Sequence, residues 1–265
     1  MTAVLYEVRD AVATITLNRP QALNALDQSM IEGLRAACDR AAYDPGVRAV
    51  LVRAAGDHFM AGGDLKWFRE QFVLSPAERQ ACFSQVVASA NASAELLRTM
   101  AKPVVAAVQG AAAGYGLSLM LSADLVLAAD DAYFTTAYCK IGQSPDGGAT
   151  WSLPRVVGLR RAMEIALLGD RFNAARAAEL GIVNRVVPRA QLADEAAALA
   201  RRLADGPTAA LARTKALLNQ SLTTPLSAQL AAEQQSFAAC GAEPDFVEGL
   251  AAFFEKRPAA FSGRS

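Results

Sequence analysis

The sequence predicts an α/β fold that ends in a helical segment. Runs rich in Val, Ile and Leu alternate with segments of helical period through the first two-thirds of the chain, and glycine-rich turns separate them. After about Gly206 the patterns are only helical. We therefore expect an α/β core over residues 1–205 and a C-terminal helical segment over residues 206–265 that is used for packing or assembly.

The N-terminal third supplies strands and one amphipathic helix. Runs at 3–8 and 12–17 flank Arg9-Asp10-Ala11, which predicts a β-hairpin. From Asp27 the apolar residues recur at helical spacing, and Asp27 can accept backbone N–H bonds as the N-cap. The run at 47–52 predicts a buried strand.

The middle of the chain continues this alternation. Ser75-Pro76-Ala77-Glu78 is a capping box with proline in the first turn, and the helix is expected to reach about Met100. Strands are predicted at 102–108 and 124–129, with a glycine-rich turn and a short helix between them. In the C-terminal segment, Thr224 is the expected cap of a helix that has Pro225 at its first position.

The composition argues against several classes of protein, namely nucleic-acid-binding, membrane and metal-binding proteins. The 265 residues are 53% apolar and carry 26 basic and 26 acidic side chains, so a net charge of zero attracts neither nucleic acid nor an anionic membrane. No apolar run is long enough to span a membrane, and no signal peptide is visible. The four cysteines lack metal-site and disulfide spacing, so we expect reduced core or near-core thiols in a cytoplasmic protein without a metal.

Two glycine-rich turns are candidate anion-binding sites. "MAGGDL" at 60–65 and "GAAAGYGLSL" at 110–119 each lead towards a helix, where backbone N–H groups can bind an oxyanion. For the first segment the pattern alone favours an ordinary tight turn between a strand and a helix, and the second segment alone is weak evidence for an anion site. The second turn fits neither the dinucleotide fingerprint, the P-loop nor the nucleophile elbow.

Two other side chains are candidates for chemistry. His58 is the only histidine, which excludes a zinc site built from several histidines, and a structural or surface role is the simpler interpretation. Asp146, in "SPDGGATWSLPR", either caps a helix running from Gly147 towards Val157 or carries a proton. The residues alone leave both interpretations open.

Six segments, taken in order, resemble the crotonase family, also called the enoyl-CoA hydratase/isomerase superfamily. They lie at residues 17–26, 59–65, 102–124, 134–159, 166–187 and 253–261. The resemblance implies a core of ββα units wound into a spiral, with C-terminal helices that support homotrimers, often paired into hexamers. It also implies an acyl-CoA thioester as substrate, with coenzyme A carried by that substrate and no separate cofactor.

The resemblance assigns roles to the two turns. Crotonases bind the thioester carbonyl with two backbone N–H groups, and the matching residues are Gly63 and Tyr115, the latter where most relatives have glycine. Enoyl-CoA hydratases hold water between two glutamates, and the matching residues here are Ser118 and Tyr138. Neither can act as a carboxylate base at neutral pH, so a standard hydratase mechanism is disfavoured.

The segment 134–155 is closest in pattern to 1,2-epoxyphenylacetyl-CoA isomerase-like and double-bond isomerase members, in which the residue matching Asp146 is the single acid/base. Burial should raise the pKa of such a carboxyl, with Trp151 and Leu153 as the expected apolar wall. A dehalogenase-like role, with the aspartate as nucleophile, is disfavoured because the helix at 76–100 contains no histidine.

Family geometry also suggests substrate contacts. Backbone near 22–24 and 61 would meet the pantetheine and adenine, lysines would meet phosphates, and parts of 66–90 would line the acyl pocket. A solvated surface role explains either lysine as well, and Lys256 would reach a neighbouring subunit's site. The expected substrate-binding residues are Ala22, Leu23, Asn24, Ala61, Lys66, Tyr138 and Lys256.

Together these features predict an acyl-CoA isomerase that moves a double bond or rearranges a ring-bearing phenylacetyl-type CoA, with Asp146, Gly63 and Tyr115 as its catalytic groups. Two alternatives remain. One is an unusual hydratase or hydrolase in which Asp146 activates water, and the other is a non-catalytic acyl-CoA-binding paralogue.

Overall fold

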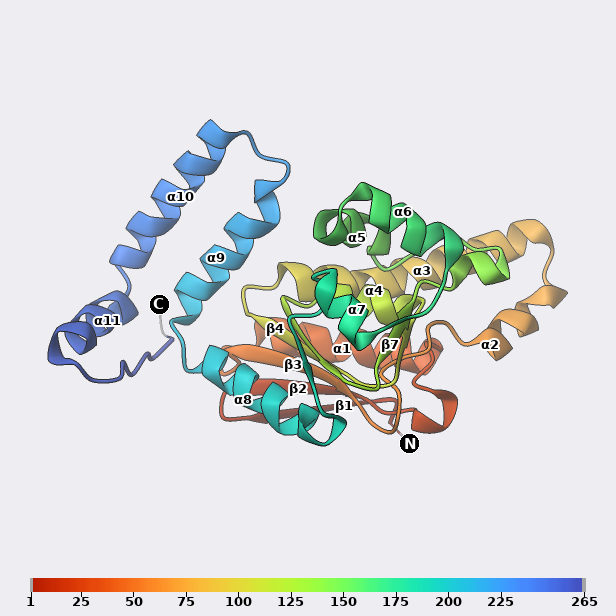
Figure 1. Ribbon diagram of the computed structural model, residues 1–265, viewed down its shortest axis with the longest axis horizontal. Coiled ribbons are helices and arrows are strands. Elements are labelled where there is room, and N and C mark those ends of the chain that lie inside the picture. The colour runs from red at the N-terminus through yellow and green to blue at the C-terminus, as the bar shows by residue number, and fades with distance from the viewer. Residues whose placement is uncertain (1, 264–265) are drawn as a thin grey trace.

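The computed structural model describes residues 2–263 and has an α/β body with a helical arm (Figure 1). A six-stranded sheet has the order β1-β2-β3-β4-β6-β9, and a three-stranded sheet has the order β5-β7-β8. Only the β1–β2 and β7–β8 pairs are antiparallel. The strands are β1 (Val4–Arg9), β2 (Val12–Leu17), β3 (Ala49–Ala54), β4 (Val104–Val108), β5 (Ala111–Ala113), β6 (Leu125–Ala129), β7 (Tyr133–Thr135), β8 (Phe172–Asn173) and β9 (Arg185–Val187).

Helices follow most strands, as the alternating pattern predicts. They are α1 (Gln28–Tyr43), α2 (Leu65–Glu70), α3 (Pro76–Thr99), α4 (Tyr115–Leu121), α5 (Ala149–Val157), α6 (Leu159–Leu168), α7 (Ala174–Glu179), α8 (Leu192–Ala204), α9 (Thr208–Ser221), α10 (Leu226–Gly241) and α11 (Pro244–Glu255). Four short 3-10 turns are η1 (Pro20–Ala22), η2 (Gln71–Val73), η3 (Tyr138–Ile141) and η4 (Arg189–Gln191).

Local signals in the sequence fix several of these elements. The hairpin predicted around Arg9-Asp10-Ala11 is confirmed, with Asp10 and Ala11 both at positive φ, as a tight two-residue turn requires. Asp27 caps α1 by accepting the Met30 N–H. Ser75 and Glu78 form the expected capping box at the start of α3.

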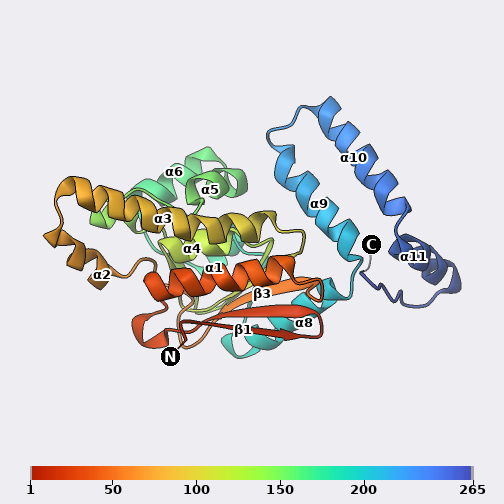
Figure 2. The ribbon, with the colours of Figure 1, turned by 180° about the vertical axis from the view of Figure 1, so that it is seen from behind.

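The large sheet has a core on each face. On one face, residues such as Val50, Val52 and Val104 pack with apolar residues of α1 and α3. On the other face, the alternate residues, such as Leu51 and Val105, pack against α8. Successive strand residues point to opposite faces, so the nearly continuous apolar strands fill both cores. Figures 1 and 2 show α8 and α1 on opposite sides of the sheet.

The C-terminal helices α9, α10 and α11 extend away from the body (Figures 1 and 2). An ion pair holds helix α9 to the body: the Lys215 ammonium lies 2.8 Å from the Asp124 carboxylate. Many large apolar side chains on this arm are exposed, namely Leu218, Leu222, Leu226, Leu230, Phe237, Val247, Phe253 and Phe254. The division at residue 205 and the role in assembly stay predictions.

Two expectations about local structure are wrong. Thr224 does not cap α10, because Pro225 occupies the cap position and the Thr224 hydroxyl donates to the Gln220 carbonyl of the preceding helix. Cys139 is exposed, unlike the buried Cys38, so it is not a core thiol. Within residues 2–263, no helix is both long and apolar enough to cross a membrane.

Candidate active site

A cavity of about 280 Å³ lies between the two glycine-rich turns, α3 and the loop that precedes α5. Gly63, Tyr115 and Asp146, which come from three separate parts of the sequence, all line it. The structure therefore brings together the three residues that the sequence singled out for catalysis. Tyr138 and Ala61, two of the expected substrate contacts, line the same cavity.

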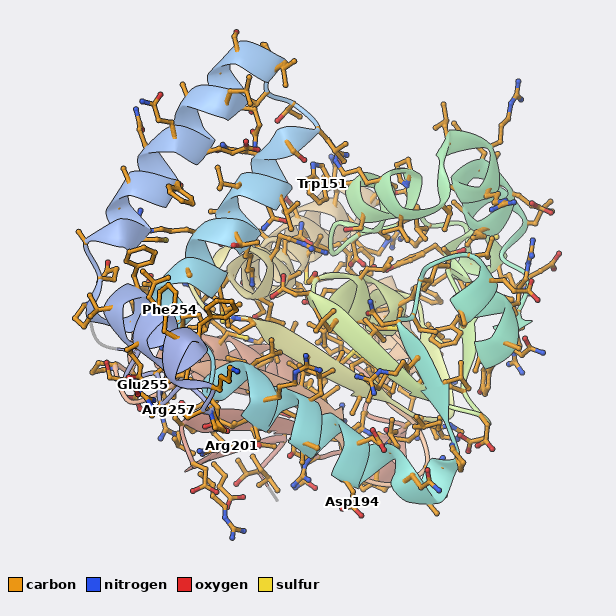
Figure 3. The ribbon with its side chains drawn as sticks, turned by 60° about the vertical axis from the view of Figure 1, so that its left-hand side comes forward. Trp151, Asp194, Arg201, Phe254, Glu255 and Arg257 are labelled. Carbon is orange, nitrogen blue, oxygen red and sulfur yellow. The ribbon has the colours of Figure 1, made fainter. Side chains whose placement is uncertain are left out.

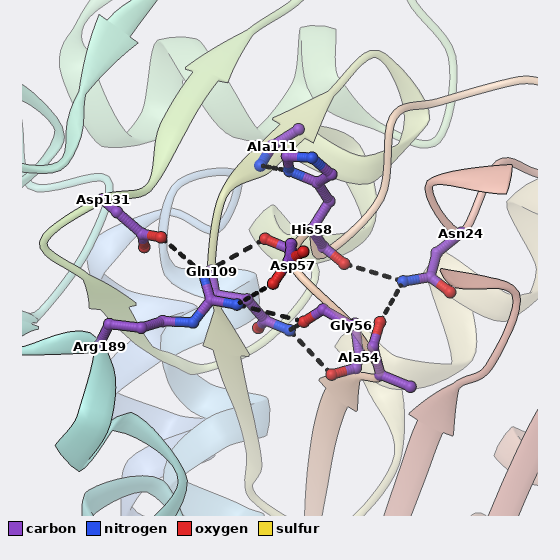
Figure 4. A network of polar contacts seen from close by, with 10 residues as sticks. Asn24, Ala54, Gly56, Asp57, His58, Gln109, Ala111, Asp131 and Arg189 are labelled. Carbon is purple, nitrogen blue, oxygen red and sulfur yellow. Dashed lines mark hydrogen bonds and ion pairs between the residues drawn. The ribbon is translucent and has the colours of Figure 1, made fainter. Parts of the chain in front are cut away.

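The first turn is held by a polar network in the loop that follows β3 (Figure 4). The buried Asn24 amide donates to the carbonyls of Ala55 and His58, at 3.0 and 2.8 Å. Gln109 donates to the Ala54 and Gly56 carbonyls. These bonds satisfy partly buried backbone carbonyls and fix the path of the chain into residues 60–65.

His58 belongs to this network rather than to the cavity. Its Nδ1 accepts the backbone N–H of Ala111 at 3.1 Å (Figure 4), which ties the loop after β3 to β5. The structural role expected for the single histidine is confirmed. Among residues 2–263, no cluster of three or more His, Cys, Asp or Glu side chains could hold a metal ion.

The two turns meet through backbone pairing of Met60 with Ala112. Met60 N–H donates to the Ala111 carbonyl, and Ala113 N–H donates back to Met60. A Cβ built on Gly116 would lie 2.3 Å from the Met60 carbonyl oxygen, so only glycine permits this approach. The pairing places the two turns side by side at the cavity wall.

The Gly63 and Tyr115 N–H groups are available to a ligand. Within residues 2–263, neither donates a hydrogen bond to another protein group. Tyr115 is the first residue of α4, where helix N–H groups have no partner inside the helix, and its φ is not positive. A tyrosine is thus compatible with this backbone. The arrangement can bind a carbonyl oxygen that gains negative charge.

The Tyr115 side chain is buried. Its hydroxyl donates to the Ala90 carbonyl of α3 at 2.6 Å, and burial raises the pKa of this phenol well above its usual value. Tyr115 therefore joins α3 to α4 through its side chain while its backbone faces the cavity.

Asp146 does not cap a helix. Helix α5 begins only at Ala149, its cap residue is Gly148, and no side chain caps it. The Asp146 carboxylate instead accepts the Tyr138 hydroxyl at 2.5 Å. Burial raises the pKa of Asp146 above its usual value, and the bond from Tyr138 opposes this rise. The helix-cap interpretation is therefore wrong, and a half-buried carboxylate faces the cavity.

The loop around Asp146 is fixed from three sides. The Ser118 hydroxyl donates to the Asp146 backbone carbonyl at 2.8 Å, and the Asn91 side-chain oxygen accepts the Gly147 N–H at 2.9 Å. Ser118 and Tyr138, which the family resemblance matched to the two hydratase glutamates, thus both contact Asp146. Nothing in the α3 pattern marked Asn91, because its role depends on a residue 56 positions away.

The apolar wall of the cavity is not the expected one. Trp151 is 42% exposed on α5 (Figure 3) under the Arg155 guanidinium, and the buried Leu153 does not line the cavity. The helix after Gly148 turns both side chains away from the cavity. The wall comes from the region expected to form an acyl pocket, with contributions from Leu26, Leu65, Phe68, Phe83, Val86, Val87, Ala90 and Ile141.

Aromatic rings dominate part of this wall. Trp67, Phe68 and Phe83 pack edge to face, with ring centroids 5.2 to 5.7 Å apart. A Cβ built on Gly63 would lie 2.5 Å from the Phe68 ring, so this ring covers the Gly63 turn. The cavity therefore offers an apolar chamber beside two N–H donors and one carboxylate.

The remaining expected contacts lie around or outside the cavity. Leu23 and Asn24 have positive φ, and Ala61 N–H donates to the Leu23 carbonyl, which places 22–24 beside the first turn. Lys66 is exposed and does not line the cavity. Lys256 ends α11 on the arm, so it does not reach this cavity within one chain. Contacts of any of these with coenzyme A stay predictions.

Comparisons with known proteins place this geometry in a family. The sequence profile described as enoyl-CoA hydratase/isomerase matches residues 7–264. The chain belongs to the enoyl-CoA hydratase/isomerase family. It is 39% identical to the Escherichia coli K12 1,2-epoxyphenylacetyl-CoA isomerase, over 100% of both chains. It is 40% identical to a Rhodobacter capsulatus protein named "Probable enoyl-CoA hydratase", over 98% of both chains.

The fold agrees with this family. A Mycobacterium abscessus crystal structure assigned to the enoyl-CoA hydratase/isomerase type superposes with a TM-score of 0.95 at 40% identity and covers 99% of this chain and 100% of that one. The predicted crotonase fold is therefore confirmed. Hydratase and isomerase names both occur among these relatives, so family membership gives an enzyme of acyl-CoA chemistry without choosing between the two reactions.

Proposed function

We propose that this chain is an acyl-CoA isomerase that moves a double bond, or rearranges a ring-bearing phenylacetyl-type CoA, through a thioester enolate. The observation that carries the proposal is the position of a single carboxylate, Asp146, in the same cavity as the unbonded N–H groups of Gly63 and Tyr115.

Isomerisation through an enolate requires both the two N–H donors and the carboxylate. Removing a proton from the carbon next to a thioester creates an enolate, and the two N–H donors stabilise its oxygen. Losing one such donor typically costs roughly 3–4 kcal/mol of transition-state stabilisation. Asp146 takes the proton at that carbon, becomes the acid, and returns the proton two carbons away. One carboxylate suffices because the reaction consumes no water.

The neighbours of Asp146 favour isomerisation over hydration. Ser118 and Tyr138 occupy the positions of the two hydratase glutamates, and burial raises the pKa of Tyr138, so its phenol stays protonated at neutral pH. The alternative is a hydratase or hydrolase in which Asp146 activates water, and the name of the Rhodobacter relative favours it. A non-catalytic acyl-CoA-binding paralogue is the third candidate.

The test compares Asp146→Asn with wild type on a 3-enoyl-CoA, with Asp194→Asn on the surface helix α8 as the matched control (Figure 3). We expect Asp146→Asn to lose roughly 10²–10⁴-fold in kcat, as is typical for a removed acid/base, and the control to keep full activity. Equal rates for Asp146→Asn and wild type would remove Asp146 from the mechanism.

Labelled water separates the three candidates. The product of an isomerase gains no ¹⁸O in H₂¹⁸O, and in D₂O it gains deuterium only to the extent that the proton on Asp146 exchanges with solvent. Incorporation of ¹⁸O would instead establish hydration or hydrolysis. Tight acyl-CoA binding with no turnover across a panel of chain lengths and ring-bearing acyl groups would establish the non-catalytic paralogue.

The proposal also covers the assembly of the enzyme, its contacts with coenzyme A and its location. The apolar side chains exposed on α9, α10 and α11 support assembly into homotrimers, alone or paired into hexamers. In such an assembly, Lys256 contacts the coenzyme A of a neighbouring subunit, and Lys66 is the candidate contact within the chain. We propose a cytoplasmic enzyme without a cofactor of its own.

A further inference from the structure

Tyr138 is built into the site by a sharp turn. Ala137 has φ +56°, which starts η3 and directs the Tyr138 side chain into the cavity wall. The phenol oxygen lies 2.5 Å from Asp146 Oδ1. This distance is that of a charge-assisted O–H···O⁻ bond, in which the phenol donates and the carboxylate accepts.

Ser118 fixes the direction of that bond. Its hydroxyl donates to the Asp146 backbone carbonyl at 2.8 Å and lies 3.3 Å from the Tyr138 oxygen. The serine proton is used on the carbonyl, and the tyrosine has only one proton, which goes to the closer carboxylate oxygen. Among residues 2–263, no other side chain donates to the Asp146 carboxylate.

We infer that Tyr138 is a positioning residue for Asp146: its hydroxyl occupies Oδ1 and leaves Oδ2 as the oxygen that carries the proton. This inference rests on the proposed proton transfer by Asp146. A carboxylate with two free oxygens can rotate and offer either one. With Oδ1 held, Oδ2 has a fixed position relative to the N–H donors, as proton return to a second carbon requires.

Tyr138 also controls how strongly Asp146 holds its proton. Burial raises the pKa of Asp146, whereas the Tyr138 bond stabilises the charged form and lowers it. Without the phenol, the largest influence that opposes burial is lost, and the pKa of Asp146 rises further. The base then remains protonated, and inactive, at pH values where the wild-type carboxylate is ionised.

Few other titratable or charged groups lie close enough to Asp146 to shift its pKa. The titratable side chains that face Asp146 are Tyr138 on η3 and Tyr115 on α4, and burial keeps both phenols neutral. Helix α3 presents the neutral amide of Asn91 to the adjoining Gly147. No cation within residues 2–263 forms an ion pair with Asp146.

The test is Tyr138→Phe, which removes one oxygen and keeps the ring. Tyr6→Phe is the matched control, because the Tyr6 hydroxyl is buried on β1 and has no hydrogen-bond partner within residues 2–263. We expect the acidic limb of kcat/KM for isomerisation to move upwards by roughly one pH unit in Tyr138→Phe, the worth of one hydrogen bond to a charged group. The control should keep the wild-type profile.

The pattern of loss separates positioning from packing. Raising the pH should recover the part of the lost activity that comes from the raised pKa of Asp146, while the part that comes from the released Oδ1 should remain; a packing defect alone lowers activity equally at every pH and leaves the acidic limb in place. An equal loss at every pH would overturn the inference. Ser118→Ala, which frees the Asp146 carbonyl and leaves the phenol in place, should give a smaller upward shift than Tyr138→Phe.

A measurement without turnover keeps this inference distinct from the proposed function. Infrared difference titration reports the Asp146 carboxyl directly, with Asp146→Asn identifying the band. We expect its pKa to rise in Tyr138→Phe and to stay unchanged in Tyr6→Phe. An unchanged pKa in Tyr138→Phe would overturn the role of Tyr138 whatever reaction the enzyme performs.

Discussion

The Tyr115 ring packs directly against Gly147, since a Cβ built on Gly147 would lie 3.0 Å from two of its ring carbons. The Tyr115 N–H faces the cavity, and Gly147 follows the proposed proton carrier Asp146. One residue therefore supports both halves of the proposed chemistry. Its hydroxyl bond to Ala90 anchors this support to α3.

Gly147→Ala should impair catalysis more than folding. The added methyl would lie 2.6 Å from the Ser118 Cβ and against the Tyr115 ring, at a φ of +61° that disfavours any Cβ. The Asp146 loop must shift to relieve these contacts, and a shift of about 1 Å at a reacting group can cost roughly 10²-fold in rate. Steady-state isomerisation kinetics measure this loss in kcat.

Gly148→Ala is the matched control for this substitution. Its φ of +81° carries a similar backbone cost, but among residues 2–263 no atom beyond its two chain neighbours lies within 4 Å of the added Cβ. We expect Gly148→Ala to lower the melting temperature by the backbone cost alone and to keep nearly wild-type kcat. Equal losses of kcat in both would attribute the effect to backbone strain rather than to contact with Tyr115 and Ser118.

The activity should fall on the acidic side at an unusually high pH. Because burial raises the pKa of Asp146, the base becomes protonated at a pH above about 3.9, the usual value for aspartate. A pH profile of kcat/KM from 4 to 9 measures the midpoint of this limb. Full activity at pH 4 would contradict a buried aspartate as the base.

The same raised pKa has a consequence for stability. A carboxyl whose pKa is higher in the folded than in the unfolded state destabilises the fold once it ionises, so this contribution worsens as pH rises from the unfolded to the folded pKa. Asp146→Asn removes the charge. Its melting temperature at pH 7 should therefore equal or exceed that of wild type, and a lower value would contradict this sign.

The buried pair of Lys215 and Asp124 should hold α9 to the body. The Lys215 ammonium also donates to the Leu97 and Lys102 carbonyls. Burial raises the pKa of Asp124 and lowers that of Lys215, so each charge depends on the other. Lys215→Met leaves a buried carboxylate unpaired and should cost roughly 3–5 kcal/mol in the free energy of unfolding, measured with urea.

The double variant Lys215→Met with Asp124→Asn provides the comparison. The asparagine oxygen can still accept the Val104 N–H that Asp124 accepts at 2.8 Å, without an unpaired charge. We expect the double variant to be more stable than Lys215→Met alone. If the single and the double variant unfold at the same urea concentration, the loss of stability in Lys215→Met comes from lost packing and not from the unpaired carboxylate of Asp124.

Assembly should depend on the apolar side chains of the arm. Phe237 on α10 is largely exposed in one chain, and so is Phe254 near the end of α11, which Figure 3 labels. Phe237→Asp with Phe254→Asp should lower the mass measured by light scattering, because burying unpaired charges opposes association. Val73→Asp, a change at a still more exposed apolar residue on η2, should leave the mass unchanged. A wild-type protein that is already monomeric would exclude the proposed trimer.

Local signals alone determined much of the fold. Asp27, the Ser75–Glu78 capping box and the Asp10-Ala11 turn act on backbone groups only a few residues away, so their outcome is contained in the sequence. Six motifs in family order likewise predicted the crotonase fold. The prediction that Thr224 caps α10 was wrong because Pro225, the next residue, occupies the cap position.

The tertiary structure decided what surrounds Asp146. Its sequence context suited a helix cap, but Gly147 and Gly148 both have positive φ, which delays α5 until Ala149 and frees the carboxylate. The prediction that Trp151 and Leu153 form the apolar wall beside Asp146 was wrong, because the packing of α5 against its neighbours sets the direction of its side chains.

The bond between Tyr138 and Asp146 and the contact between Tyr115 and Gly147 join separate elements. The sequence could name these residues, and through the family resemblance it could place Gly63 and Tyr115 in one site. It could not say which side chain would meet which, because distances between elements depend on how the whole core packs.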